Sequence, residues 1–416
     1  MRLLIPLLAS ALLGAAADRP PVLVIALDGF RHDYAARDGA ANLLALAREG
    51  AAVQNWVPVF PSTTFPNFHA MATGLVPARH GLVAMVFRDP ETGRSFSYQE
   101  NSREGFWYGG KPIWQLAEEQ GVLAATYFWP GTDAGVNGKY PSYFKRYDPR
   151  ATHAERIAQV LDWFRLPAAE RPGLAIVYFS DVDAMGHAHG PDSPEVRAAV
   201  ARVDAAVGEI VRGVRALRPD VNILAVSDHG MSAVDRVIDF SRDADLSGCR
   251  AANEAPMTML YCADPERVRA ELLSQPRPYT VERRGELPAH LSFSGNARIG
   301  DLIIRPKGPS IVYALPPGDP RAKPVPPLKG MHGYDPAANP EMRGILIAAG
   351  PAFRPGARAA GARTVDLYPL LGELLGLSLP ADIDGRLSRV RGLLRESARS
   401  PRPTPPGRAR STSARP

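Results

Sequence analysis

Three short apolar runs, each followed by an acidic residue, dominate the pattern of hydrophobic and polar positions along this chain. The runs are VLVIAL (22–27), LAIVYFS (174–180) and VNILAV (221–226). Continuous apolar runs of this length predict strands that are buried on both faces, as in a parallel sheet. The acids that follow them are Asp28, Asp183 and Asp228. Because ligands of open α/β sheets bind at the carboxyl ends of the strands, we expect these acids at a functional edge.

Stretches with helical spacing of apolar residues alternate with the predicted strands. They cover residues 40–49, 68–74, 111–120, 154–165, 193–217 and 365–377, and further strands are predicted at 122–129 and 344–350. This alternation predicts an α/β fold, a three-layer α/β/α sandwich with a central, mostly parallel sheet. Between residues 240 and 327 the pattern weakens into short strands and Pro-rich loops. We expect these to be excursions from the main sheet and not a second independent domain.

The two ends of the chain differ in composition from the body. Residues 1–17 have Arg2, an apolar stretch and an Ala-Ala-Ala cleavage site, which predicts a signal peptide and a periplasmic or secreted protein. Residues 395–416 are rich in Arg, Pro and Ser, which predicts a disordered tail. One catalytic domain is therefore expected over residues 18–394, within a chain of 416 residues.

Charge and cysteine content narrow the class of partner. The net charge is +6, and the tail alone contains six Arg and one Glu, so the body is nearly neutral and a basic groove for nucleic acid is not expected. No stretch after the signal is long and apolar enough to predict a transmembrane segment. Cys249 and Cys262 could form a disulfide in an oxidising compartment or remain two buried thiols. The oligomeric state is not predictable from these patterns.

Histidines accompany the acids that end the predicted strands. His187 follows Asp183 by four residues, His229 follows Asp228 directly, and His332 lies in a glycine-flanked loop. Three carboxylates and three imidazoles suit zinc, and six ligands suffice for two sites of three. Two metals can clamp the attacking and leaving oxygens of a displacement at phosphorus. The sequence therefore predicts a two-metal phosphotransfer or hydrolysis site.

A Pro-rich loop over residues 58–67 supplies candidate nucleophiles. It contains Ser62, Thr63 and Thr64, and Thr64 is expected near the start of the next helix, where free backbone N–H groups favour anions. A threonine hydroxyl in contact with a metal would lose its proton readily and become a nucleophile. The chain has neither a G-x-S-x-G elbow nor a G-x4-G-K-[ST] loop, which disfavours a serine hydrolase or a P-loop enzyme.

Several motifs carry a family resemblance. They are ALDGF (26–30), TFPN (64–67), TGLVPARHG (73–81), KPIW (111–114), FWPG (128–131), DAMGHAHGP (183–191), SDHGM (227–231) and MHGYD (331–335). With them the chain resembles the nucleotide pyrophosphatase/phosphodiesterase family of the alkaline phosphatase superfamily, which implies an alkaline phosphatase-like fold.

The resemblance also implies a catalytic site. It implies two zinc ions (two Zn²⁺), with Thr64 as the nucleophile between them and a phosphothreonine intermediate whose hydrolysis releases a nucleoside monophosphate. One zinc would be held by Asp28, Asp228 and His229, and the other by Asp183, His187 and His332. Asp181 is an alternative to Asp183, which fits the spacing to His187 better.

The resemblance implies a substrate site as well, with one departure. Phe65 and Tyr147 match the positions that sandwich the nucleobase, although each could instead pack in the core. About twenty residues after the nucleophile the family usually has an Asn that donates to a phosphate oxygen, whereas this chain has Met85, whose thioether cannot donate. Losing such a donor typically costs about 10²–10³ in rate. A slower enzyme, another donor such as the Phe65 N–H, or a different substrate would each be consistent with Met85.

Two other functions remain open from the sequence. One is a phosphomonoesterase, or a phospholipid or phosphonate hydrolase, of the same superfamily. The other is a metal-containing binding protein that has lost catalysis, which only Met85 supports. Since all six ligands and Thr64 are present, we expect an enzyme that cleaves nucleotide phosphodiester or pyrophosphate bonds.

Overall fold

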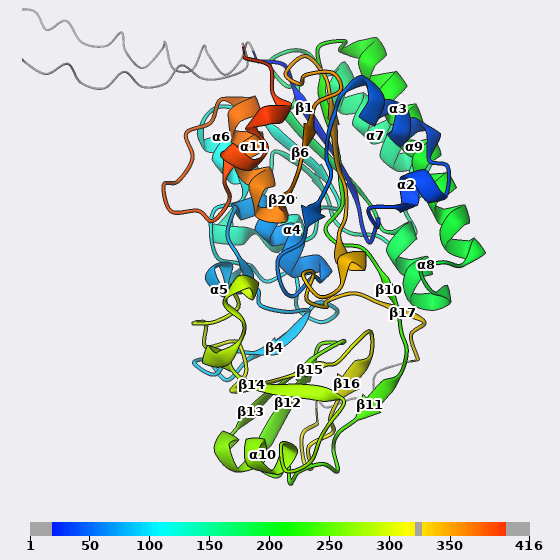
Figure 1. The fold of residues 1–416 in the computed structure, drawn as a ribbon. Helices are drawn as coiled ribbons and strands as arrows, with labels where there is room; N and C mark the ends of the chain where they lie inside the picture. The colour runs from blue at the N-terminus through cyan, green and yellow to red at the C-terminus, as the bar shows by residue number, and fades with distance from the viewer. Residues whose placement is uncertain (1–18, 321–326, 397–416) are drawn as a thin grey trace, which may run out of the picture.

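An eight-stranded sheet forms the centre of the computed structural model, which describes residues 19–320 and 327–396 (Figure 1). In spatial order its strands are β19 (Arg358–Ala359), β2 (Ala51–Val53), β18 (Leu346–Ala349), β9 (Asn222–Val226), β1 (Val22–Leu27), β8 (Leu174–Phe179), β6 (Ala124–Tyr127) and β7 (Tyr143–Lys145). From β9 to β7 all neighbours are parallel, and β18 is antiparallel to β9 and β2. The strands predicted from the continuous apolar runs are therefore the three central ones.

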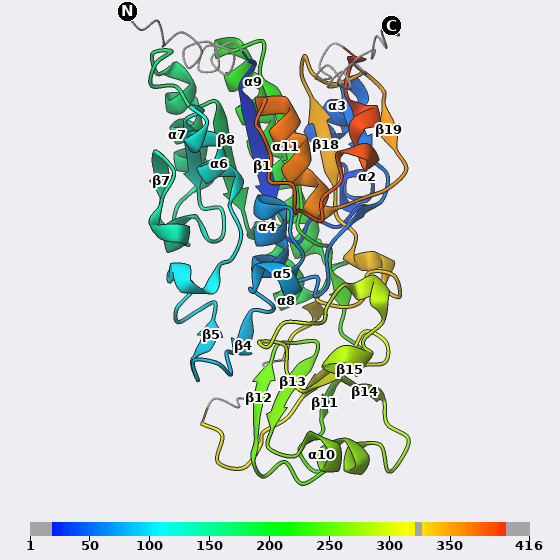
Figure 2. The same ribbon diagram turned by 90° about the vertical axis from the view of Figure 1, so that its left-hand side faces the viewer.

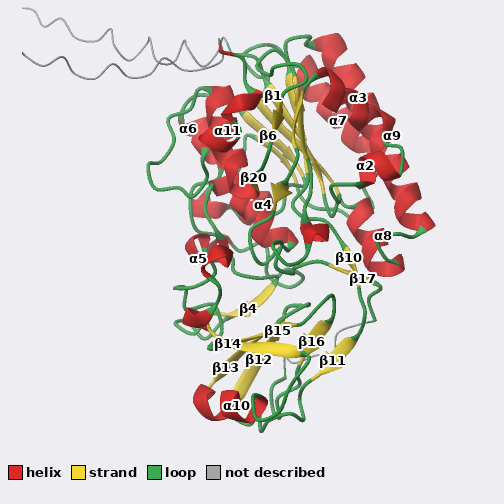
Figure 3. Cartoon of the chain, viewed as in Figure 1, coloured by secondary structure: helices red, strands yellow, loops and turns green. Residues whose placement is uncertain are grey.

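Helices cover both faces of this sheet (Figures 1 and 3). One layer contains α3 (Ala41–Glu49), α7 (His153–Arg165) and α9 (Pro194–Leu217), with α2 (Tyr34–Arg37) and α8 (Asp181–His189) beside it. The other contains α4 (Thr64–Thr73), α6 (Ile113–Glu119) and α11 (Leu367–Leu375), with α5 (Pro77–His80) following α4. The predicted three-layer α/β/α sandwich is confirmed.

A second, smaller sheet lies beyond the carboxyl ends of β1 and its neighbours, at the bottom of Figures 1 and 2. Its order is β12 (Cys249–Asn253), β13 (Thr258–Cys262), β15 (Leu302–Pro306) and β14 (Tyr279–Arg283), with α10 (Pro265–Leu272) packed beside it. These strands pair with one another and bury their own apolar cluster, so the chain makes an excursion from the main sheet here and forms a separate sheet within it.

Four shorter strand pairs lie outside the two sheets. They are β4 (Val86–Arg88) with β5 (Ser95–Ser97), β10 (Ser232–Ala233) with β17 (Gly330–Met331), β11 (Val237–Asp239) with β16 (Ile311–Tyr313), and β20 (Ala362–Arg363) with β3 (Trp56–Val57). The chain therefore leaves the main sheet after β9 and returns to it through β17.

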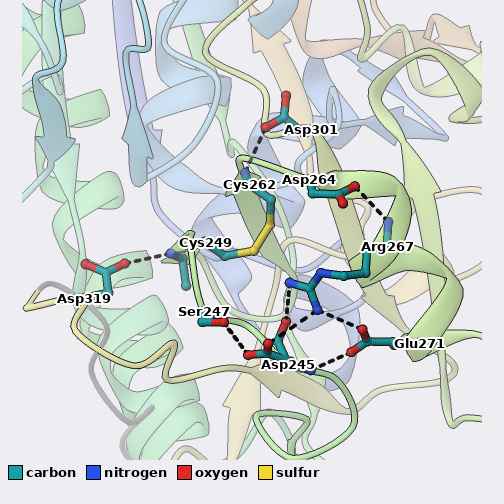
Figure 4. Close-up of a disulfide and its surroundings, with 10 residues drawn as sticks. Asp245, Ser247, Cys249, Cys262, Asp264, Arg267, Glu271, Asp301 and Asp319 are labelled. Atoms are coloured by element: carbon teal, nitrogen blue, oxygen red, sulfur yellow. Dashed lines mark hydrogen bonds and ion pairs between the residues drawn. A yellow bond between two sulfur atoms is a disulfide. The ribbon is translucent and has the colours of Figure 1, made fainter.

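Cys249 and Cys262 form a disulfide between the two first strands of the smaller sheet (Figure 4). They are direct partners in the antiparallel register of β12 and β13. The Cys262 N–H donates to Asp301 at 3.0 Å, so the disulfide lies within a hydrogen-bonded part of this sheet. Of the two states that the sequence left open, the structure has the paired one.

The ends of the described chain bear on two further expectations. The predicted signal peptide lies outside the described residues, as does the tail from residue 397 onward. Arg395 still belongs to the fold, because its N–H donates to Ala352 O at 2.8 Å. Among the described helices, none combines the length and the apolar character needed to cross a bilayer.

Candidate active site

Asp28 directly follows β1, where Gly29 allows the chain to turn beside α8. Gly29 has φ +64°, and a Cβ built there would lie 2.9 Å from the Cα of Asp183. The Gly29 N–H donates to Asp228 Oδ1 at 3.2 Å, which ties the ends of β1 and β9 together. The close approach of the end of β1 to α8 therefore brings Asp28 next to Asp183.

Helix α8 presents its two predicted ligands on one face. Asp183 and His187 are four residues apart, which is one helical turn. His187 Nε2 lies 3.5 Å from Asp183 Oδ2, and His187 Nδ1 is 2.9 Å from Gly330 O. Because a carbonyl oxygen can only accept, Nδ1 carries the proton and Nε2 is the free ring nitrogen.

The remaining ligands come from the end of β9 and from the segment after β17. His229 Nε2 lies 3.0 Å from Asp228 Oδ2 and 3.5 Å from Asp28 Oδ1. His332 Nε2 lies 3.1 Å from His187 Nε2 and 3.4 Å from Asp183 Oδ1. The His229 and His332 rings stack with centroids 3.6 Å apart, so the six predicted residues form one continuous cluster.

Two overlapping groups within this cluster have the spacing of metal sites. One contains Asp28, Asp228 and His229, and the other Asp183, His229 and His332, with the ligand atoms of each group within 4.8 Å of one another. His187 adjoins the second group through the two contacts just described. Since His229 belongs to both groups, two bound ions would be neighbours.

The hydrogen bonds around the cluster leave several of its polar atoms without protein partners. All three histidines direct Nδ1 at a backbone carbonyl, namely Gly330, Gly230 and Ser62. Their Nε2 atoms are then acceptors. Those of His187 and His332 face each other at 3.1 Å, and that of His229 faces both Asp228 Oδ2 and the Thr64 hydroxyl. Asp28 Oδ1, Asp183 Oδ1 and Asp228 Oδ2 are buried and have no hydrogen-bond partner among the described residues. Facing acceptors and unpaired carboxylate oxygens are stable only with cations between them, so the residues fit a divalent metal.

Burial and mutual repulsion shift the pKa values of acidic and histidine side chains in the cluster. Burial raises the pKa of the Asp28 carboxyl well above its usual value, and the charges of Asp228 and Asp183 raise that pKa further. Burial lowers the pKa of the His332 ring well below its usual value, and His229 and His187 lower it further. Burial thus disfavours the charged forms of Asp28 and His332, whereas the charge of Asp228 helps to raise the pKa of His229. A bound cation would favour the charged carboxylates and the neutral rings.

Thr64 is the first residue of α4 and faces the cluster. Its Oγ1 lies 3.2 Å from His229 Nε2, and its side chain is 8% exposed. Asn67, one turn later, fixes the loop that precedes the helix, since its side-chain amide donates to Val59, Pro61 and Thr63 and its Oδ1 accepts from the Val59 N–H. The structure thus holds the Thr64 hydroxyl beside the metal-ligand group that contains Asp28.

A cavity of about 680 Å³ opens over Thr64 and the cluster. Its aromatic lining is Phe65, Tyr98, Phe128, Trp129, Tyr147 and Tyr178. Tyr147 is 43% exposed and packs edge-on against Phe128, so the core-packing alternative for Tyr147 is wrong. Phe65 is half-buried against Phe96 and Tyr98. Both predicted base-binding residues line the same cavity as Thr64.

Met85 also lines this cavity. Its Sδ lies 3.3 Å from the backbone nitrogen of Phe65 and accepts that N–H. The thioether therefore accepts a hydrogen bond from a backbone N–H in the first turn of α4, next to Thr64. The Met85 side chain therefore points into the site.

Other residues of the site could not be found from the sequence. The Tyr178 hydroxyl donates to Asp28 Oδ2, and the only available signal was its place in the strand beside Asp28. The Glu254 carboxyl accepts hydrogen bonds from two backbone amides near Thr64. Its neighbours in sequence form no motif that could have indicated this role. Asp181, the alternative ligand, instead pairs with His153 at 3.0 Å and belongs to neither metal-ligand group.

Comparison with known proteins agrees with this geometry. The family model described as type I phosphodiesterase/nucleotide pyrophosphatase matches residues 22–335. An uncharacterized pyrophosphatase/phosphodiesterase of Schizosaccharomyces pombe is 36% identical over 86% of this chain and 77% of its own length. A bovine bis(5'-adenosyl)-triphosphatase is 32% identical over 95% of this chain and 87% of its own.

Longer relatives and solved structures extend the similarity. Ectonucleotide pyrophosphatase/phosphodiesterase family member 1 of mouse is 32% identical over 92% of this chain, which spans only 44% of that relative. The structure of murine ectonucleotide pyrophosphatase/phosphodiesterase 5 superposes with a TM-score of 0.83 at 29% identity, and covers 90% of this chain and all of the other. An inactive variant of the same murine protein, solved in complex with AMP, superposes equally well.

Proposed function

Because this chain belongs to the type I phosphodiesterase/nucleotide pyrophosphatase family, we propose that it hydrolyses nucleotide phosphodiester and pyrophosphate bonds with Thr64 as nucleophile and two zinc ions as cofactors. The observation that carries the proposal is that Thr64 Oγ1 lies 3.2 Å from His229, within the ligand cluster and under an aromatic cavity. A hydroxyl, a divalent-metal site and a stacking surface are the three parts that such a hydrolase needs.

We assign one zinc ion to Asp28, Asp228 and His229, and the other to Asp183, His187 and His332. The free Nε2 atoms and the unpaired carboxylate oxygens support a divalent metal, and the mixture of nitrogen and oxygen ligands supports zinc. When bound, the two ions would supply positive charge to the attacking and leaving oxygens of the displacement.

Thr64 carries out the covalent step. Its hydroxyl loses a proton to solvent, and Oγ1 attacks the phosphorus of the nucleotide. The new bond from Oγ1 to phosphorus forms as the bond to the leaving oxygen breaks, which gives a phosphothreonine ester. Water then attacks the same phosphorus and gives up a proton, the bond to Oγ1 breaks, Oγ1 takes up a proton to restore the hydroxyl, and a nucleoside monophosphate leaves. The Phe65 N–H at the start of α4 would exchange its bond to Met85 Sδ for one to a phosphoryl oxygen and stabilise that oxygen during both displacements.

Phe65 and Tyr147 bind the nucleobase in this proposal. Aromatic side chains stack on every base, so the site would tolerate different bases. Similarity to a relative named for a bis(5'-adenosyl) substrate, and to a structure that contains AMP, supports a nucleotide ligand. The disulfide of the smaller sheet supports an exported protein, since disulfides persist in oxidising compartments.

Replacing the nucleophile tests the proposal. Thr64→Ala is expected to lower turnover of the nitrophenyl ester of thymidine monophosphate by at least about 10³-fold, because the attacking hydroxyl is lost. The variant should keep two zinc ions per chain in elemental analysis, and Thr63→Ala, the neighbouring control, should keep most of the turnover. Unchanged turnover of Thr64→Ala would remove Thr64 from its role, and loss of zinc together with turnover would make that role structural.

A further inference from the structure

Glu254 is a buried carboxyl that the proposed reaction does not use. It lies in the turn between β12 and β13 of the smaller sheet and is 4% exposed. Its Oε1 accepts the N–H of Met85 at 2.7 Å, and its Oε2 accepts the N–H of Val86 at 2.8 Å. The Glu254 N–H donates to Met257 O at 3.0 Å, which closes the turn. One carboxyl thus joins the smaller sheet to the segment that opens β4.

The segment also reaches the residue next to the nucleophile. The Met85 side chain extends from the clamped backbone to Phe65, where its Sδ accepts the N–H at 3.3 Å. Phe65 follows Thr64 in the first turn of α4, where the N–H groups have no partner within the helix. The chain of contacts from Glu254 through Met85 to the Phe65 N–H therefore reaches the place where a phosphoryl oxygen would bind.

The carboxyl is kept here without a compensating cation. Among the described residues, no Lys, Arg or His forms an ion pair with Glu254, and two backbone amides are its hydrogen-bond donors. Burial raises the pKa of Glu254 to about 8, although the N–H groups of Met85 and Val86 and the side chain of Thr63 oppose that rise. A buried acid with a strongly raised pKa, bonded to a residue that lines the cavity over Thr64, is typical of functional sites.

We propose that Glu254 is a positioning residue, which holds the Met85 thioether over the Phe65 N–H. The thioether excludes water from this N–H and keeps it oriented toward the phosphoryl group. A thioether is a weak acceptor, so it yields the N–H readily to a phosphate oxygen. Water would compete more strongly for the same donor if Met85 moved away. This inference rests on the proposed function, because it assumes that phosphorus binds at Thr64.

The test uses the two phosphorothioate diastereomers of the nitrophenyl ester of thymidine monophosphate. One diastereomer puts sulfur, and the other oxygen, on the side of the Phe65 N–H. Glu254→Gln keeps the size of the side chain but directs an amide donor at a backbone N–H, which displaces Met85. We expect kcat to fall about 10-fold to 100-fold, a KM within about twofold of the wild type, and a clear change in the preference between diastereomers.

Glu282→Gln is the matched control. Glu282 is another carboxyl of the smaller sheet, bonded to Arg305 and not to the Met85 segment, and its loss should leave the diastereomer preference unchanged. If Glu254→Gln unfolds, Met85→Leu serves instead, since it removes the sulfur while it keeps the apolar volume, and it should change the same preference.

Two results would overturn the inference. The first is a Glu254→Gln variant with the kcat and diastereomer preference of the wild type. The second is a lower kcat with an unchanged preference, which would mean that Glu254 only supports the fold. If the wild-type enzyme does not turn over the diester at all, the proposed function fails and the inference falls with it. The wild-type rate in the same assay therefore distinguishes the two failures.

Discussion

At the scale of single residues, the site depends on which ring nitrogen of each histidine is free. His187, His229 and His332 all direct Nδ1 at a backbone carbonyl, so each presents Nε2 to the cluster. The types of the six ligands could be predicted from the sequence, because Asp and His at strand ends are a recognisable signal. The ring orientations could not be predicted, because Gly330 and Ser62 are 143 and 270 residues from the rings that they hold.

Loss of a single carboxylate charge should empty part of the metal site. Asp228→Asn keeps an oxygen for the Gly29 N–H but removes the charge beside His229. We expect bound zinc to fall from two ions to about one per chain, with at least about 10²-fold slower turnover of the diester. Elemental analysis of the purified protein measures the zinc. Asp181→Asn is the control, since Asp181 pairs with His153, and equal zinc in both variants would contradict the assignment.

The stability of the fold should depend on pH through Glu254. Its usual pKa is 4.5, and burial raises the folded value to about 8. Between these values the unfolded chain releases the proton while the folded chain keeps it, so stability falls as the pH rises and the loss is complete above about 8. The loss is on the order of 5 kcal/mol.

Glu254→Gln removes this titration, which gives a direct comparison. The stability of the variant relative to the wild type should increase from pH 5 to pH 8.5 in urea unfolding, even though its turnover is lower. Parallel pH profiles for the two proteins would contradict the raised pKa. Glu282→Gln should follow the wild-type profile, because Glu282 is paired with Arg305 in the smaller sheet.

At the scale of elements, the central strands were predictable and α8 was not. β1 has the predicted bounds, and β8 and β9 differ from prediction by one residue at one end, because continuous apolar runs have few other possible structures. Helix α8 carries few apolar residues, so no periodicity marked it. Its helical form matters for function, since it brings Asp183 and His187 onto one face.

The junction of β1 and α8 can be tested at Gly29. Gly29→Ala would combine a positive φ with a Cβ 2.9 Å from the Asp183 Cα, whereas Gly39→Ala has a positive φ and nothing within 4 Å. Both variants should lose about 1 kcal/mol from the backbone conformation. Gly29→Ala should lose about 2 kcal/mol more and bind less zinc, because Asp183 must shift. Equal stability and zinc content in both variants would show that this contact does not shape the site.

At the scale of the whole molecule, the smaller sheet helps to build the site. Glu254 bonds to Met85 across 169 residues of sequence, and His332 lies on the segment that returns from the smaller sheet to the main one. The sequence predicted short strands there but not their pairing, because half-exposed strands with alternating polar residues leave the partner unspecified. The main sandwich, in contrast, follows from local apolar runs, and its architecture was predicted correctly.

We propose that this chain is a metal-dependent phosphodiesterase. This proposal is tested most directly by paired rates on the nitrophenyl ester of thymidine monophosphate and on nitrophenyl phosphate, with zinc present and after chelation. We predict a strong preference for the diester that chelation abolishes and added zinc restores. A preference for the monoester, or a diester rate that survives complete removal of the metal, would contradict the account.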